Sequence, residues 1–155
     1  MQAVLDCFTE TFINKLDAKG RVSIPSSFRQ VLAGQGTEGV YVLKAVSGER
    51  ALTAFGNTLL SSAREQLKPH HPILSRGYAP RAQAIFGQAR RLAFDDEGRV
   101  RLPDDLIAHI GAGERVCFVG LNDIFEIWNP ETFEPVQAAR LADARSIFDA
   151  SGGSP

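Results

Sequence analysis

A chain of 155 residues with a formal net charge of −1 fits one compact domain, or two small halves that share a core. Its 44% hydrophobic and 23% charged residues are ordinary for a soluble globular protein, and no apolar run approaches the roughly 20 residues of a membrane helix. Two isolated cysteines argue against a disulfide framework, and the first ten residues hold two acids and no base, unlike a signal peptide. We therefore expect a cytoplasmic protein without a membrane partner.

The charge is distributed unevenly along the chain. Residues 1–50 carry a net charge of +1, residues 51–93 carry +5 and residues 94–155 carry −7. A site for a polyanion is therefore expected in the first two segments, although a solvated surface of uneven charge explains the same counts.

Apolar periodicity and turn residues predict the elements of the first half. In order, these are a strand at 9–16, a short return strand at 21–24, a helix from Pro25 to Gly34, and strands at 40–46 and 51–55. Asp17 and Gly20 supply turn chemistry between the first two strands, since Asp accepts hydrogen bonds from the backbone ahead and Gly tolerates positive φ. The heart of this half is thus a predicted β-hairpin.

The second half repeats the same order of elements. The predicted elements are strands at 91–94 and 99–102, a helix at 103–111, and strands at 115–120 and 124–128. Between the halves, helical spacing predicts two helices separated by His70-His71-Pro72, the second running from Ala79 to Arg90. Pro130 opens a last helix, and the polar residues 150–155 predict a flexible tail.

The two halves also share a sequence motif. Leu-Asp-Ala-Lys-Gly-Arg-Val-Ser-Ile-Pro at residues 16–25 is matched, 78 residues later, by Phe-Asp-Asp-Glu-Gly-Arg-Val-Arg-Leu-Pro at 94–103. A half of about 50 residues buries too little surface to be comfortably stable alone. We therefore expect a duplicated α+β fold whose two copies pack on each other as an intramolecular pseudo-dimer.

An arginine follows each turn, Arg21 in the first copy and Arg99 in the second. The arginine fork can meet O6 and N7 of guanine together, and a two-stranded ribbon fits the major groove of DNA. The spacing equally suits an ion pair across the turn with Asp17 or Asp95, and the two roles are compatible if the aspartate orients the arginine.

The tips of the two turns differ in charge. Ala18 and Lys19 of the first copy are replaced by Asp96 and Glu97 in the second. The first turn is therefore expected to dominate nucleic-acid binding, although Arg99 and Arg101 remain in the second.

Other candidate sites are weaker. No glycine-rich phosphate cradle, nucleophile elbow or zinc-protease pattern occurs, so no enzyme, cofactor or small-molecule substrate is predicted. His70 and His71 lack accompanying ligands, and a turn and a helix N-terminus explain the acids at 95–97 and 104–105, so no metal site is predicted. A basic stretch consists of Arg76, Arg81, Arg90 and Arg91, and Arg81 and Arg90 are predicted to lie on a helix. These arginines could contact phosphates, contact the acidic half of a neighbouring subunit, or form ion pairs within the chain.

Residues 16–29 strongly resemble the first repeat of the MraZ family, and residues 95–103, with Phe118-Val119-Gly120 and Phe125-Glu126-Ile127-Trp128, resemble its second. The resemblance extends from about residue 9 to about residue 145. It implies a swapped-hairpin, AbrB-like β-barrel with short helices. The implied parts are a SpoVT/AbrB-like repeat at 9–56, a helical connector at 57–90, a second repeat at 91–134, and a C-terminal helix and flexible tail at 135–155.

The resemblance also implies a function. Members of the family are bacterial transcriptional regulators that form ring-shaped homo-oligomers and bind G-rich direct repeats in double-stranded DNA upstream of the division and cell wall gene cluster, which places the protein at the nucleoid. Their DNA-contacting positions map onto Lys19, Arg21 and Arg99. To these we add Arg101, and assign the shaping of the hairpins to Asp17, Gly20, Asp95 and Gly98.

Two other functions are compatible with the residues alone. A near-neutral chain with an acidic second half suits an oligomeric scaffold that binds a protein through its hairpins. The acids from Asp95 to Asp105 suit a metal-dependent hydrolase less well, because a turn and a helix end account for them.

Overall fold

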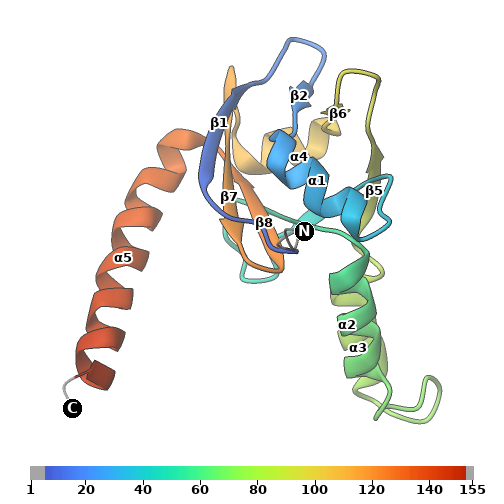
Figure 1. Cartoon of the computed structure of the whole chain (residues 1–155). Coiled ribbons are helices and arrows are strands. Elements are labelled where there is room, and N and C mark those ends of the chain that lie inside the picture. Colours follow the sequence, from blue (N-terminus) through green and yellow to red (C-terminus); the bar gives the residue numbers. More distant parts are fainter. Residues whose placement is uncertain (1–5, 153–155) are drawn as a thin grey trace, which may run out of the picture.

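The computed structural model describes residues 6–152, and its strands and helices combine into an α+β fold with a mostly antiparallel sheet (Figure 1). The strands are β1 (Thr11–Lys15), β2 (Arg21–Ser23), β3 (Gly39–Lys44), β4 (Leu52–Phe55), β5 (Arg90–Ala93), β6 (Arg99–Arg101), β7 (Arg115–Leu121) and β8 (Ile124–Trp128). The helices are α1 (Ser26–Gly34), α2 (Asn57–Leu67), α3 (Tyr78–Ile85), α4 (Asp104–Ile110) and α5 (Pro130–Gly152). The predicted α+β class and the repeated order of two strands, a helix and two strands are confirmed.

Strand pairing interleaves the two halves of the chain. The larger sheet has the order β1-β7-β8-β4-β3-β5, so β1 pairs with β7 of the second half and β5 pairs with β3 of the first. At the centre, β4 pairs with β8. Each half therefore contributes its first strand to hydrogen bonds with the other half.

The short return strands do not form the simple hairpins that the sequence predicts. Leu16 and Val22 make a single bridge between the arms of the first turn, and beyond it β2 pairs with β6 instead of β1. Val22 lies opposite Val100 in this pairing, and both side chains are 1% exposed. Pairing β2 with β6 buries both valines over the core, which a local hairpin would not achieve.

The core lies between the larger sheet and helices α1 and α4. Phe28 of α1 packs against Phe8 and Phe125, with ring centroids 5.3 and 4.7 Å apart. Leu106 and Ile110 of α4 belong to the same buried cluster. The phenylalanines of the first half thus share one core with apolar residues of the second.

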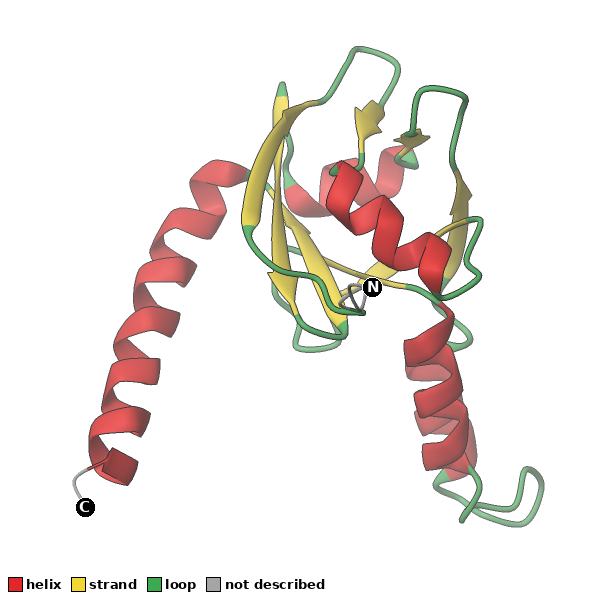
Figure 2. Ribbon diagram, viewed as in Figure 1, coloured by secondary structure: helices red, strands yellow, loops and turns green. Residues whose placement is uncertain are grey.

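Two helical arms leave the strand-rich body, α2 with α3 on one side and α5 on the other (Figure 2). Both arms point away from the end of the molecule that carries the β1–β2 and β5–β6 loops (Figure 1). No helix within residues 6–152 is long and apolar enough to cross a membrane.

Two predicted boundaries are wrong. Helix α3 ends at Ile85, and Arg90, expected on that helix, begins β5 instead. Its backbone pairs with Val42 and its guanidinium with Asp105, contacts that a helical Arg90 could not make together. The flexible tail is predicted to begin at Ala150, but helix α5 continues to Gly152, and alanine is a residue that favours a helix. Residues 153–155 of the predicted tail lie outside the described residues.

Candidate nucleic-acid interface

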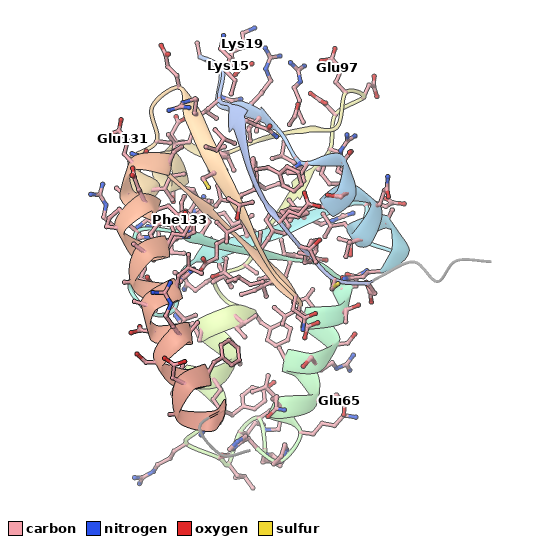
Figure 3. The ribbon with its side chains drawn as sticks, turned by 60° about the vertical axis from the view of Figure 1, so that its left-hand side comes forward. Lys15, Lys19, Glu65, Glu97, Glu131 and Phe133 are labelled. Atoms are coloured by element: carbon pink, nitrogen blue, oxygen red, sulfur yellow. The ribbon has the colours of Figure 1, made fainter. Side chains whose placement is uncertain are left out.

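Two loops lie at the same end of the molecule. Each is named together with the arginine that follows its turn, so residues 16–21 are the first loop and residues 94–99 the second loop. Figure 3 shows Lys19 of the first loop and Glu97 of the second at this end, together with Lys15 of β1. Glu65 of α2 lies at the opposite end of the molecule. The charged tips of both repeats therefore face the same side.

In the first loop, the Asp17 carboxylate binds three donors. Oδ1 accepts the backbone N–H groups of Lys19 at 2.9 Å and Arg21 at 2.8 Å, and Oδ2 accepts Nε of Arg21 at 2.7 Å. Gly20 has a φ of +81°, which L side chains rarely adopt, and donates to the Asp17 carbonyl at 3.0 Å. The backbone hydrogen bond from Arg21 is the main cause that lowers the pKa of Asp17, so the carboxylate is ionised at neutral pH.

The second loop repeats this geometry. Asp95 accepts the backbone N–H groups of Glu97 and Arg99, each at 2.9 Å, and Nε of Arg99 at 2.9 Å. Gly98 has a φ of +76° and donates to the Asp95 carbonyl at 3.0 Å. The backbone hydrogen bond from Arg99 is the main cause that lowers the pKa of Asp95. In both copies the aspartate thus orients the arginine that follows the turn.

Three arginines share one face of the ribbon formed by β2 and β6. In its register Arg21 lies opposite Arg101, and Ser23 lies opposite Arg99. Because successive side chains of a strand alternate between faces, these residues lie opposite the face of the buried valines. Like charges directly across an antiparallel pair repel each other, so an anion bound over this face would stabilise it.

The two loops differ in how their charges are paired. Lys19 is exposed and forms no ion pair with any residue between 6 and 152. At the matching position, Oε2 of Glu97 lies 3.3 Å from Nη2 of Arg99. Asp95 first, and Glu97 to a smaller extent, raise the pKa of Arg99. The second loop therefore offers less free positive charge than the first.

Arg29 of α1 is a residue near the site that the sequence reasoning missed. Its Nε donates to the carbonyl of Ile24 at 3.1 Å, and its guanidinium lies so close to Gly98 that a Cβ at that position would displace it. In the second copy the matching residue is Ile107, which lies next to Gly20. Extending the alignment of the two copies four positions past the shared proline would have revealed this difference.

The other sequence candidates have structural partners. Asp105 forms two hydrogen bonds with Arg90, at 2.7 and 2.6 Å, and His71 Nδ1 accepts backbone N–H groups of its own turn. In the described part of the chain, no group of three or more His, Cys, Asp or Glu side chains is arranged to hold a metal ion. Burial raises the pKa of the Cys117 thiol to about 11, so it is protonated at neutral pH.

The basic residues of the connector do not form one patch. Arg81 is on α3, where its Nη1 donates to the carbonyl of Gly77 at 3.1 Å. Arg90 and Arg91 are on β5, and Arg91 lies 3.9 Å from Glu38. Pairing within the chain therefore accounts for Arg90 and Arg91.

The geometry defines an α+β protein with two copies of an Asp-x-x-Gly-Arg loop displayed at one end. A family model described as "MraZ protein, putative antitoxin-like" matches residues 85–149. Over 96% of its length the chain is 40% identical to a protein named transcriptional regulator MraZ from Xanthobacter autotrophicus, covering 93% of that protein. Proteins of the same name from Beijerinckia indica and Rickettsia bellii are 42% and 36% identical over 92% of the chain, which covers 83% and 96% of them. The chain belongs to the MraZ family, and the resemblance seen in the motifs is confirmed.

Proposed function

We propose that this protein is a sequence-specific DNA-binding transcriptional regulator. The observation that carries the proposal is the β2–β6 ribbon, which places Arg21, Arg99 and Arg101 on one face beside two loops at the same end. A two-stranded ribbon fits the major groove, and an arginine whose Nε is held by aspartate presents its fork already oriented for guanine. The names of the relatives support the same function.

The proposed roles follow the geometry of the loops. Arg21 and Lys19 of the first loop make the main DNA contacts, while Arg99 and Arg101 contribute the rest. Asp17 with Gly20, and Asp95 with Gly98, hold the two loops in shape. The division into repeats at 9–56 and 91–134, a connector at 57–90 and a C-terminal part at 135–155 belongs to the same proposal, as does the swapped-hairpin, AbrB-like barrel. The exchange of β1 and β5 between the halves supports this intramolecular pseudo-dimer.

We further propose that the protein acts as a ring-shaped homo-oligomer in the cytoplasm, associated with the nucleoid. A chain of net charge −1 gains little from bulk attraction to DNA, whereas several identical loops on one assembly raise the effective concentration for neighbouring DNA repeats. The proposed targets are G-rich direct repeats upstream of the division and cell wall gene cluster, including the protein's own promoter.

The two helical arms support self-assembly. On α5, Leu141, Ile147 and Phe148 are 59%, 62% and 72% exposed. The other arm has a cavity of about 520 Å³ lined partly by Leu67, Ile85 and Phe86. The arms lie on different sides of the body. The arm of residues 57–85 carries more basic than acidic residues, and α5 carries more acidic than basic ones. Complementary surfaces on different sides favour head-to-tail contacts, which close into rings when the rotation permits.

Replacing Arg21 by Ala tests the DNA-binding assignment. The variant is expected to lose at least about tenfold in affinity for a fragment from upstream of the protein's own gene, because a bidentate arginine–guanine contact is removed. Arg21→Lys keeps the charge without the fork, so it should also lose sequence selectivity while retaining weak binding.

Gel-shift titration at a stated salt concentration measures both effects, and light scattering should show an unchanged assembly mass. Arg145→Ala, an exposed change on α5, is the matched control. Undiminished binding by Arg21→Ala would remove Arg21 from the interface.

A further inference from the structure

The fork of the loop arginine is differently occupied in the two repeats. In the first loop, the ion pair of Arg21 within residues 6–152 is with Asp17, through Nε, which leaves both terminal nitrogens of the guanidinium available. In the second loop, Nε of Arg99 is held by Asp95 at 2.9 Å, and Glu97 lies 3.3 Å from Nη2. The carboxylate of Glu97 thus occupies part of the fork that the first loop leaves free.

The occupied atom is the one that DNA would need. Arginine recognises guanine and phosphate through its terminal nitrogens, because these present two parallel N–H donors to two acceptor oxygens or nitrogens. A carboxylate is an anionic acceptor of the same kind as a phosphate. Glu97 and DNA therefore compete for the same donors of Arg99.

The competition is partial because the pair is exposed. The Glu97 side chain is 71% exposed and the Arg99 side chain 28%. An exposed ion pair is weak, so DNA can displace Glu97, but it must separate the pair and bring phosphates close to a carboxylate. The second loop is weakened as a reader and not abolished.

Among residues 6–152, the Glu97 side chain makes no hydrogen bond that shapes the loop. The second loop is built by Asp95, by Gly98 and by the contact of Arg29 with Gly98. In the described structure, the one polar contact of the Glu97 carboxylate is with Arg99. Changing this carboxylate therefore alters the charge offered to DNA without altering the fold of the loop.

We propose that Glu97 is a specificity-determining residue: its carboxylate competes with DNA for Arg99, so the two loops of one chain read DNA unequally. Arg21 and Arg99 occupy matching positions of the two copies, and two equal readers at these positions would not by themselves distinguish the two directions of a site. Because Glu97 covers part of the Arg99 guanidinium, the two arginines bind DNA unequally, and each chain binds its site in one orientation. This inference rests on the proposed DNA-binding function.

The test compares two changes that remove the same charge from the second loop. Glu97→Gln releases Arg99 and is expected to raise the affinity for the promoter fragment by about threefold or more. Asp96→Asn removes a neighbouring exposed carboxylate that has no hydrogen bond or ion pair in the described structure, so its effect should be clearly smaller. Fluorescence anisotropy with a labelled fragment measures both, and thermal melting confirms that both variants fold.

A third variant separates the release of Arg99 from the general effect of removing a negative charge. In an Arg99→Ala background, Glu97→Gln should raise the affinity no more than Asp96→Asn does. An equal gain from Asp96→Asn, no gain from Glu97→Gln, or a full Glu97→Gln gain that survives without Arg99 would each overturn the inference. If the unmodified protein binds its fragment selectively and Glu97→Gln has no effect, only this inference fails. If the unmodified protein shows no selective DNA binding, the proposed function fails first and this inference fails with it.

Discussion

Asp17 and Asp95 each bind three donors of their own loop, two backbone N–H groups and one arginine Nε. These charge-assisted hydrogen bonds are stronger than neutral ones, and they keep a long flexible side chain in one orientation. An arginine that is already oriented loses less conformational entropy when it binds a base. At the residue scale, the proposed DNA-binding site therefore includes the acid next to each arginine, although its charge has the same sign as that of DNA.

Replacing Asp17 by Asn separates this orienting role from bulk electrostatics. The variant removes a negative charge, so attraction to DNA alone predicts tighter binding. Loss of the charge-assisted contacts to Lys19 and Arg21 predicts the opposite, and we expect DNA binding weaker by about tenfold. Gel-shift titration beside Asp96→Asn, which removes the same charge outside the hydrogen-bond network, measures the difference. Tighter binding by Asp17→Asn would show that charge outweighs orientation.

At the scale of the element, a polar cluster and an aromatic contact attach helix α5 to the sheet. The Glu126 side chain on β8 is 9% exposed and accepts Nε1 of Trp128 at 2.9 Å and Nη1 of Arg140 at 2.6 Å. The guanidinium of Arg140 also lies 5.8 Å from the ring centroid of Trp128. Phe133 packs against the same tryptophan with centroids 5.5 Å apart. The first turns of α5 are thus held both by apolar contact and by a largely buried ion pair.

Arg140→Ala is expected to weaken this attachment. The substitution leaves the Glu126 carboxylate buried without its cationic partner. Because the Arg140 side chain is 35% exposed, solvent weakens the ion pair, and we expect the unfolding free energy to fall by about 2 kcal/mol. Urea denaturation followed by the fluorescence of Trp128, the one tryptophan of the chain, measures the loss. Arg145→Ala, on the same helix, should change stability by less than about 0.5 kcal/mol. Equal losses in the two variants would contradict a specific role for Arg140.

At the scale of the whole molecule, the proposed DNA contacts and the proposed surfaces for self-association lie at opposite ends. The two loops occupy one end, while the arms carry their exposed apolar residues away from it (Figure 1). Exposed apolar patches of this kind mark interaction surfaces. An assembly formed through the arms would leave all the loops free on one side, which is the arrangement that multivalent binding needs.

Phe148→Asp tests the contribution of the distal part of α5 to assembly. A buried phenylalanine contributes about 1.5–3 kcal/mol, so placing a charge at this position should shift the protein to smaller assemblies at micromolar concentration. Ser146→Asp adds the same charge at an exposed polar position two residues away and should leave the mass unchanged. Light scattering coupled to size exclusion measures both. An unaltered mass for Phe148→Asp would exclude this residue from the interface.

The hydrogen bonds of the two loops and the order of the elements follow from residues that are close together in the sequence. The hydrogen bonds of Asp17 and Asp95 span at most four residues, so the Asp-x-x-Gly-Arg pattern encodes them locally. Apolar spacing and turn residues likewise predicted the kinds of elements, because both signals depend on neighbouring positions of the chain. The duplication of the motif was sufficient to indicate the family.

Only the tertiary structure decided which strands pair and which charges meet across the repeats. The pattern of a strand reports its buried face but not its partner, so neither the pairing of β2 with β6 nor the place of Arg90 in β5 could be predicted from it. The same holds for Arg29, which reaches Gly98 from the other repeat, and for the facing of Arg21 and Arg101. These contacts join residues about 50 to 80 positions apart, and they form only because both halves must bury their apolar faces in one shared core.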